Sequence, residues 1–490
     1  MFWNLSRSKR RGPIRPNELR VSVLVMTERV RRLNDIPMQP GKYVLYWAQM
    51  NRRADSNHAF AYAAGLANDA GLPVLVYEGL TCSYPHANDR FHIFLLEGVP
   101  ENQRRFRALG AGYCFHLRRR LADPDDAFYR LAQDAAAVVT DDYPTFVARQ
   151  HNASVPAKLL VPYFAVDASC IVPMSVFEKR EYAAFTLRPK IKRQLAKYLE
   201  PVASVRLKRK FEFPTPKLHT EVSDGNIAEL VASCEINHAI RPSTAFRGGS
   251  LEAQRRLRCF LRKSLARYAG QSNQPSAHAT SNLSPYLHFG HIAALRIAIA
   301  ARNHARKHKL MADEFLEELI VRRELAFNFA RHTDALMSLE ALPDWARRTL
   351  ARHDGDKRPV PYSAGHLERA ETHDELWNAT QKEMLLRGKI HGYYRMYWGK
   401  KIIEWTRSHA DALAFMISIH DRYALDGRDP NTYSNILWCF GLHDRPWAER
   451  RVFGQIRYIS YEGMKRKTDI EAYIREIRSV EETGKDPYAA

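Results

Sequence analysis

The feature that most constrains this chain is an alternation of short apolar runs and helical stretches near its start. The runs have the aromatic and β-branched content of buried strands, and they are 42–48, 72–80, 111–117 and 137–142. Helical sequences, 54–71 and 123–136 among them, separate these runs. Short buried strands that alternate with helices predict a parallel sheet covered by helices on both faces.

A parallel sheet raises the question of a bound dinucleotide, and the sequence argues against one here. The first strand leads into residues 46–57, YWAQMNRRADSN, which lack the GxGxxG pattern that lets a backbone approach pyrophosphate. The chain also has no GxxxxGK[ST] phosphate loop. We therefore expect a Rossmann-like shape without the standard nucleotide-binding fingerprint.

The alternation stops at a basic, proline-containing stretch that we interpret as a linker. Beyond it the patterns are those of long helices, for example at 250–269 and 311–332. A chain of 490 residues exceeds one ordinary core, so two domains are expected. The predicted parts are a basic N-terminal extension, an α/β Rossmann-like domain, the linker and an all-α domain, at 1–20, 21–185, 186–224 and 225–490.

The charge balance limits the partners of the chain. It carries 75 Lys and Arg against 54 Asp and Glu, for a formal charge of +21. Such an excess favours a polyanion as the binding partner, with a merely basic surface or an anionic membrane as alternatives.

No secretory signal and no bilayer-length apolar run is visible in the sequence. The six cysteines lack CxxC spacing, which predicts reduced thiols in the cytoplasm and no metal site. A monomer is the default expectation.

Residues 280–290, TSNLSPYLHFG, form the first motif of chemical interest. Ser284 followed by Pro285 predicts an N-cap and the first position of a helix, with Thr280 and Ser281 just upstream. Hydroxyls and free amides at a helix start suit a phosphate. The alternative is an ordinary hydroxyl-rich helix start.

The second motif is a turn within residues 424–441, ALDGRDPNTYSNILWCFG. It contains Asp426, Arg428 and Asp429. If the turn is buried, Arg428 would pair with one carboxylate and leave the other free to accept hydrogen bonds from a ring-edge N–H group. A solvated acidic turn is the alternative.

The third motif, residues 389–406 (KIHGYYRMYWGKKIIEWT), combines five aromatic rings with five basic groups, counting His391. Trp398 and Trp405 are seven residues apart, which on a helix is two turns, about 10 Å along the axis. This spacing is typical of residues that line the buried face of a helix in a protein core. Trp377, in a preceding helical stretch, adds a third indole that a simple stripe does not require.

Together these motifs are similar to those of the class II cyclobutane pyrimidine dimer photolyases, in the photolyase/cryptochrome superfamily. The segments that carry the resemblance are EELIVRREL (317–325), TSNLSPYLHFG (280–290), HDELWNATQ (373–381), KIHGYYRMYWGKKIIEWT (389–406), LDGRDPN (425–431) and WCFGLHDRPW (438–447). In the first domain GLPVLVYEGLT, NDRFHIFLLEG and VVTDDYP follow in the expected order. The resemblance covers nearly the whole chain from about residue 20 and implies the photolyase/cryptochrome fold, with FAD in the helical domain.

The resemblance also implies which residues hold FAD. Its phosphates and ribose would lie at Tyr268, Thr280, Ser281, Asn282, Leu283 and Ser284. Its ring would be surrounded by Arg395, Asp426, Arg428 and Asp429. Three tryptophans would conduct electrons inward from the surface, with Trp398 nearest the flavin, Trp377 next, and Trp405 as the outer or alternative relay.

The same resemblance implies a DNA substrate with a pyrimidine dimer flipped into the helical domain. Trp438 would pack against the dimer, where an apolar face replaces the lost base stacking. Glu318 would form a hydrogen bond with the carbonyl edge of the dimer, and Met396 would line the same space. Basic residues within 444–467 would hold the phosphates around the lesion.

The chain departs from the family pattern at two positions. His420 stands where the family has an Asn facing the central redox nitrogen of the flavin, and a His can titrate near pH 7, which affects flavin redox poise. Ser272, beside Asn273, replaces an Arg that contacts the lesion, because the chain reads SNQP where the family reads RNDP. The lost contact would cost about 1.5–3 kcal/mol of substrate binding unless Arg322 or Arg323 takes it over.

We therefore predict an enzyme, a photolyase that splits cyclobutane dimers by electron transfer from photoexcited reduced FAD. The alternatives are a cryptochrome-like blue-light photoreceptor and a divergent flavoenzyme with another substrate, both favoured by His420 and Ser272. The retained Glu318, Met396 and Trp438 favour the photolyase. Relatives sometimes hold an antenna chromophore, such as a deazaflavin, in the first domain, and no residue pattern here identifies one.

Overall fold

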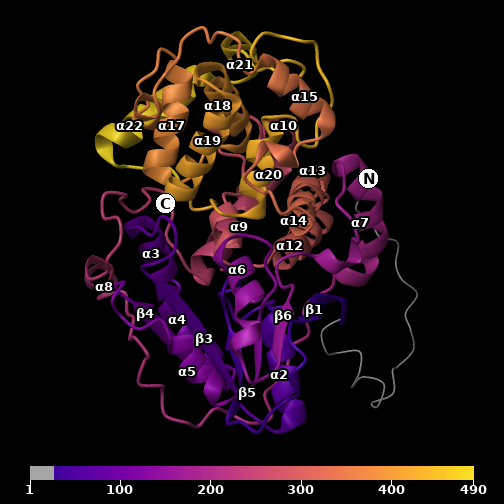
Figure 1. Cartoon of the computed structure of the whole chain (residues 1–490), viewed down its shortest axis with the longest axis vertical. Helices are drawn as coiled ribbons and strands as arrows, with labels where there is room; N and C mark the ends of the chain where they lie inside the picture. The colour runs from indigo at the N-terminus through magenta and orange to yellow at the C-terminus, as the bar shows by residue number, and fades with distance from the viewer. Residues whose placement is uncertain (1–26, 490) are drawn as a thin grey trace.

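A six-stranded sheet forms the N-terminal part of the molecule in the computed structural model, which describes residues 27–489 (Figure 1). The strands are β1 (Val30–Arg32), β2 (Tyr43–Trp47), β3 (Val74–Thr81), β4 (Gly112–Arg118), β5 (Ala135–Asp141) and β6 (Tyr163–Val166). Their order is β1-β6-β5-β2-β3-β4, with all neighbours parallel except β1, which is antiparallel to β6. The four predicted strands are confirmed as β2, β3, β4 and β5 of a parallel sheet. The parallel strand β6 and the antiparallel edge strand β1 lie where no strand was predicted.

Alternate side chains of the central strands enter two separate cores, because successive residues of a strand point to opposite faces. The helices of this part are α2 (His58–Ala70), α3 (Asp89–Leu96), α4 (Val99–Ala108), α5 (Ala127–Gln133) and α6 (Phe146–Ser154). Val44 and Tyr46 pack with α2, whereas Leu45 and Trp47 pack with α5 on the other face. Burial on both faces explains why these strands are continuous apolar runs in the sequence.

The remainder of the chain is mostly helical, as predicted, and the later helices, α15 and α17 to α22, form the upper part of the molecule in Figure 1. Its helices are α7 (Ala184–Tyr198), α8 (Ile227–Ala232), α9 (Ser250–Lys263), α10 (Tyr268–Gln271), α11 (Ser284–His288), α12 (Ala294–His308), α13 (Asp313–Leu316), α14 (Arg323–Arg331), α15 (Asp344–His353), α16 (Ala364–Glu368), α17 (Glu375–Arg387), α18 (Gly392–Trp405), α19 (His409–Tyr423), α20 (Pro430–Trp438), α21 (Tyr461–Lys467) and α22 (Ile470–Thr483). None of the helices within residues 27–489 has both the length and the apolar character needed to cross a bilayer.

The range expected to be a linker begins inside a helix. Leu187, Ile191 and Leu195 recur every four residues and are buried on one face of α7, a helical period that the basic residues between them conceal. After α7 the chain runs without helix or strand along the edge of the sheet, where the Thr220 amide donates to the Phe115 carbonyl. The predicted N-terminal extension lies outside the described residues, and the division into domains stays a prediction.

The helical part meets the sheet at the loop that follows β2. Asp141 accepts hydrogen bonds from the backbone amides of Met50 (2.7 Å) and Asn51 (2.9 Å) and so fixes this loop. Gly290 packs directly on this loop and has a φ of +71°, a conformation that favours glycine. A Cβ atom at this position would lie 1.8 Å from the Met50 carbonyl oxygen, so no larger residue fits. Arg53 completes the contact by donating to the Gly290 carbonyl at 3.1 Å. The loop that lacks a phosphate-binding fingerprint therefore forms the contact between the sheet and the helical part.

Replacing Gly290 by Ala should destabilise the protein because the new methyl group meets backbone atoms that cannot move aside. We expect a loss of about 3 kcal/mol in the free energy of unfolding, measured by urea denaturation. Gly270→Ala is the matched control, since a Cβ there meets nothing within 4 Å. Equal stability of the two variants would contradict this account of the interface.

Candidate functional site

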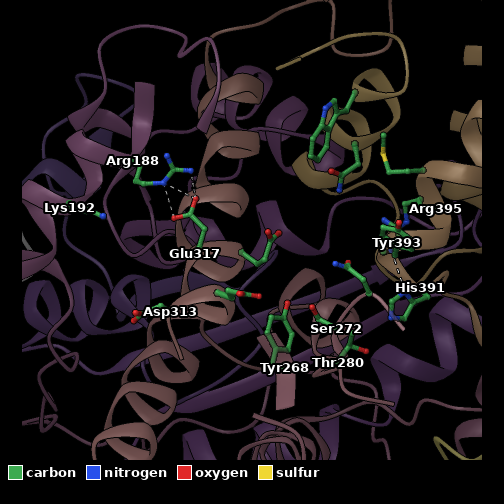
Figure 2. A pocket seen from close by; sticks show the side chains of 17 residues that line it. Arg188, Lys192, Tyr268, Ser272, Thr280, Asp313, Glu317, His391, Tyr393 and Arg395 are labelled. Carbon is green, nitrogen blue, oxygen red and sulfur yellow. Dashed lines mark hydrogen bonds and ion pairs between the residues drawn. The ribbon is translucent and has the colours of Figure 1, made fainter. Parts of the chain in front are cut away.

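The helical part contains a cavity of about 910 Å³ (Figure 2). Eight residues singled out in the sequence line it, namely Tyr268, Ser272, Asn273, Thr280, Glu318, Arg395, Met396 and Trp438. They come from five separate segments of the chain, which are α10 with its C-terminal end, the stretch before α11, the stretch after α13, and helices α18 and α20. Ser281, Asn282, Leu283 and Ser284 continue the segment that begins at Thr280 but do not line the cavity themselves.

A buried ion pair borders this cavity. Arg395 lies 3.2 Å from the carboxylate of Asp426, which also accepts a 2.7 Å hydrogen bond from the Ser284 hydroxyl. Burial alone would raise the pKa of Asp426, but Arg395, Lys389 and the Ser284 hydroxyl outweigh it and hold that pKa below its usual value. Asp426 is therefore ionised. The Nε atom of Arg395 has no hydrogen-bond partner among the described residues, so a donor remains available beside the cavity.

Two predictions about these residues are wrong in detail. Ser284 does not cap α11, because Leu283 precedes the helix and the Ser284 hydroxyl is directed to Asp426. Arg428 does not pair with a carboxylate of its own turn. Its guanidinium donates to the Asp421 carbonyl at 2.7 Å and lies 3.7 Å from the centroid of Phe91. The cation that pairs with Asp426 is instead Arg395 of α18. This contact is long-range, so the sequence around Asp426 does not predict it.

Asp429, like Arg428, lies away from the cavity and ties the helical part to the sheet. It accepts a 2.6 Å hydrogen bond from the Tyr143 hydroxyl and a 2.8 Å bond from the Asn431 amide at the start of α20. Burial works against the charge, but His288, the nearby Arg323 and the Tyr143 hydroxyl together lower the pKa of Asp429. Its position supports the cavity wall instead of forming it.

His420 is completely buried in α19 and packs edge-on against Trp398, with ring centroids 5.1 Å apart. Its Nδ1 is 3.0 Å from the Met416 carbonyl oxygen, and since a carbonyl only accepts, Nδ1 carries the proton. Burial, reinforced by Arg395, lowers the pKa of His420 to about 3. The expectation that His420 titrates near pH 7 is therefore wrong. It is a neutral imidazole whose Nε2 lone pair has no partner among the described residues.

The three tryptophans of the proposed relay form one continuous cluster. Trp377 and Trp398 are parallel, with centroids 6.4 Å apart and an interplanar angle of 2°. Trp405 meets Trp377 edge-on at 5.5 Å. Hydrogen bonds fix the two inner rings, because the Trp377 indole donates to the Trp398 carbonyl and the Trp398 indole donates to Gln381. All three rings are buried, so none of them is itself in contact with solvent, and their role as a relay stays a prediction.

One wall of the cavity is formed by residues expected to contact substrate. Glu318 lies in a π-helical segment, Glu317–Arg322, a local irregularity that often occurs at functional sites. Its side chain is accessible from the cavity, yet the surrounding protein raises its pKa through burial. On the facing helix α20, Trp438 lies 5.7 Å from the guanidinium of Arg322. An acid, a cation and an indole thus meet at one place.

Several lining residues were not predicted from the sequence. His391 caps α18 by accepting a hydrogen bond from the Tyr393 amide at Nδ1, and its Nε2–H group has no partner among the described residues. On another side of the cavity Arg188 from α7 binds Glu317 through two nitrogens, as Figure 2 shows. A His directly before the Gly that starts a helix was the available signal for His391. Nothing in the sequence near Arg188 indicates its partner.

A second cavity of about 550 Å³ lies beside the carboxyl ends of the sheet strands. Aromatic residues Trp47, Tyr77 and Phe128 line it together with His151 and Arg428. Trp47 stacks on Phe128 at a centroid distance of 4.1 Å. The cavity is therefore suited to a flat aromatic ligand.

Comparison with known proteins agrees with this architecture. The DNA photolyase family model matches residues 44–207. Deoxyribodipyrimidine photo-lyase of Methanothermobacter thermautotrophicus is 40% identical over 462 residues, which covers 93% of this chain and 99% of the relative. The protein of the same name from Potorous tridactylus is 37% identical over 445 residues, covering 88% and 81%. The solved structure of a Synechocystis cryptochrome aligns with a TM-score of 0.68 at 14% identity, over 89% of both chains.

The fold is that of the photolyase/cryptochrome superfamily, with a mostly parallel N-terminal sheet followed by a helical part. Within it, the chain belongs to the DNA photolyase family, as its motifs predicted. The predicted enzyme class, a photo-lyase, is confirmed by the curated relatives.

The low pKa of His420 makes a testable contribution to stability. The unfolded chain binds a proton on this residue below about pH 6.5, whereas the folded chain does not until about pH 3, so the free energy of unfolding falls as pH falls between these values. Asn cannot titrate. Between pH 7 and pH 5, His420→Asn should therefore lose about 2 kcal/mol less stability than the wild type, as measured by urea denaturation. Equal losses would show that His420 is protonated in the folded protein.

Proposed function

We propose that the protein repairs cyclobutane pyrimidine dimers in DNA in a light-dependent reaction, as a class II photolyase that transfers an electron from photoexcited reduced FAD. One observation carries the proposal: all five residues expected to contact a dimer and three of those expected to hold FAD line the same cavity. An electron donor and its acceptor must lie close together, and a shared cavity meets that need. Its volume of about 910 Å³ is large for a ligand site.

The polar groups of this region fit FAD. Arg395 Nε, His391 Nε2 and His420 Nε2 are buried and have no hydrogen-bond partner among the described residues, which is costly unless a ligand supplies one. Tyr268 and Thr280 would hold the phosphate and ribose groups, and the Arg395–Asp426 pair would flank the ring. Bound FAD supplies the electron that light drives toward the dimer.

The substrate side of the cavity suits a base that has left its stack. Trp438 offers an indole face and Met396 an adaptable apolar contact, which together replace base stacking. Glu318, with its raised pKa, holds its proton to higher pH than an ordinary Glu and can donate it in a hydrogen bond to a carbonyl. Arg322 lies over Trp438 and provides the cation that Ser272 no longer supplies. The formal charge of +21 suits a phosphate backbone.

His420 replaces the family Asn without introducing a charge. Because its Nδ1–H is held by the Met416 carbonyl, it offers only an acceptor, Nε2, and it stays neutral at physiological pH. A neutral side chain at this position is what the family Asn also provides. This supports ordinary photolyase chemistry over the divergent flavoenzyme that His420 first suggested.

The aromatic cavity beside the sheet is the proposed antenna site. A deazaflavin or similar planar chromophore would lie among Trp47, Tyr77 and Phe128. Arg428 lines this cavity from the helical part, so the two cavities lie on either side of the turn that carries Asp426 and Arg428. The cytoplasmic location and the monomeric state stay predictions.

A cryptochrome-like photoreceptor is the second candidate, because the solved cryptochrome shares the fold. A receptor has no need of a cavity lined by Glu318, Met396 and Trp438, which favours the photolyase. Repair activity separates the two.

Purified protein with reduced flavin should remove dimers from an irradiated oligonucleotide under blue light and not in the dark. Trp438→Ala should weaken binding of the damaged oligonucleotide by about 1–3 kcal/mol, because the base loses its stacking partner. Trp345→Ala, outside the cavity, is the control. Dimer loss, measured by chromatography, decides between a photolyase and a photoreceptor. Flavin photochemistry without any dimer loss would contradict the proposed repair activity and favour the photoreceptor.

Trp398→Phe should abolish photoreduction of oxidised flavin, because phenylalanine does not conduct the electron that the indole carries. Repair should persist when the flavin is reduced chemically beforehand, because electron transfer through the indoles is then not needed to reduce it. Flavin absorbance under illumination and dimer loss are measured in the same samples, with Trp345→Phe as the control. Photoreduction that survives in Trp398→Phe would exclude this relay.

A further inference from the structure

The segment that follows α22, residues 484–489, is anchored to the helical part by two of its side chains. Helix α22 ends at Gly484, where a left-handed backbone with a φ of +67° turns the chain. Asp486 and Tyr488 then contact the protein, whereas the residues on either side of Asp486 are exposed. Their main partner belongs to α17, which lies beside α22 (Figure 1). We call residues 484–489 the strap.

A buried ion pair holds Asp486. Its carboxylate has no exposed surface and lies 2.8 Å from Nε of Arg387, whose side chain is 2% exposed. It also accepts hydrogen bonds of 2.9 Å from the Thr244 hydroxyl and from the backbone amide of Tyr488. Separating one partner of a buried ion pair from the other is costly, because the charges lose compensation. The strap is therefore firmly held at Asp486.

Tyr488 extends this anchorage to the segment that precedes α11. Its ring meets the imidazole of His278 edge-on, with centroids 4.9 Å apart. Its hydroxyl is hydrogen bonded to the side chain of Asn282. Its backbone carbonyl accepts a 2.8 Å hydrogen bond from Arg256, which fixes the position of the residue itself. Tyr488 thus contacts both ends of the segment from His278 to Asn282.

Both of these end residues have an unusual backbone. The φ angles of His278 (+50°) and Asn282 (+54°) lie in the left-handed region that favours glycine. Such conformations persist only where surrounding contacts impose them, and they often occur where a ligand is held. Thr280, midway between the two, lines the large cavity. The strap therefore supplies contacts at both strained positions of the segment that reaches the cavity.

The same buried network reaches the cavity on a second side. Arg387 lies 3.3 Å from Glu383 and 2.6 Å from Glu476. Glu383 accepts a 3.0 Å hydrogen bond from the backbone amide of His391, which lines the cavity. Glu476 lies 3.0 Å from Nε2 of His278. Arg387 thus connects the strap to two walls of the cavity.

We propose that Asp486 and Tyr488 are positioning residues that retain FAD, because they hold the segment from His278 to Asn282 in the shape that receives the FAD phosphates and ribose. This inference rests on the proposed function, in which Thr280 and its neighbours hold those groups. None of residues 484–489 lines the large cavity, so the effect acts through the segment. When the strap is loosened, fewer molecules keep the binding shape, and the apparent affinity for FAD falls in proportion.

The test measures FAD release from the purified holoprotein, followed by the fluorescence of free FAD after dilution. Tyr488→Phe removes only the hydroxyl and should speed release about fivefold, the effect of losing one hydrogen bond. Asp486→Asn should speed it about tenfold, because Arg387 loses a charged acceptor. Glu481→Gln is the matched control, since it breaks an exposed 2.7 Å ion pair with Lys382 between the same two helices. It should release FAD at the wild-type rate.

A second measurement separates positioning from general stability. Riboflavin lacks the phosphates and the adenosine of FAD, so its binding does not need the segment from His278 to Asn282. Fluorescence titration of the apoprotein should show weaker binding of FAD to both strap variants and unchanged binding of riboflavin. Tyr488→Phe keeps the ring and its contact with His278, so it reports on the segment even where Asp486→Asn lowers the stability of the fold.

The outcomes are distinguishable. Wild-type release of FAD from Tyr488→Phe and Asp486→Asn would overturn the inference and leave the proposed function intact. An equal loss of affinity for FAD and riboflavin would also overturn it, because the strap would then stabilise the helical part as a whole. A wild-type protein that takes up no FAD would contradict the proposed function, and the inference with it. Strap-dependent retention of FAD without dimer repair would support the inference and contradict the repair activity.

Discussion

The structure depends on a single buried turn in which consecutive charged side chains take separate partners. Asp426 pairs with Arg395 beside the large cavity, Arg428 lies on Phe91, and Asp429 accepts from Tyr143. Charges in the protein interior are tolerated only when they are paired and hydrogen bonded, so each of these contacts must form for the turn to be buried. Two of the three partners belong to the N-terminal part. The turn that borders the cavity is therefore held by contacts from both parts of the molecule.

Docking in turn relies on close backbone contact at the loop after β2. In related sheet architectures a loop at this position holds a dinucleotide, and glycines on the sheet side allow the approach. Here the close approach is made by Gly290 from the helical part, and Asp141 holds the loop amides that a phosphate would otherwise need. The loop after β2 therefore lacks the features of that kind of nucleotide site. The strand ends of the sheet border the aromatic cavity and support the site in the helical part.

Much of the fold followed from local patterns, because strands buried on both faces and long amphipathic helices leave clear periodicity in a sequence. Helix α7 was missed because basic residues mask its apolar face, and β1 because three residues carry too little pattern. In the site, motif resemblance indicated the residues of the cavity but not their pairing. The partner of Asp426 is 31 positions away in the chain, and Arg188 binds Glu317 across 129 positions. The neutral state of His420 depends on burial, which no local pattern reports.

The indole cluster ends in an imidazole on both sides, and burial gives the two imidazoles different capacities. His420, at the inner end, is sealed from solvent and has its Nδ1 proton fixed by a carbonyl, so it cannot take part in proton exchange with water. His373, at the outer end, is exposed and holds a phenolic hydroxyl at Nδ1. Within the cluster, the indole N–H groups of Trp377 and Trp398 donate to the Trp398 carbonyl and to Gln381, and both rings are buried away from water. Of the two imidazoles, His373 is therefore the one that can exchange a proton with water directly, whereas His420 keeps the protonation state that its buried surroundings impose.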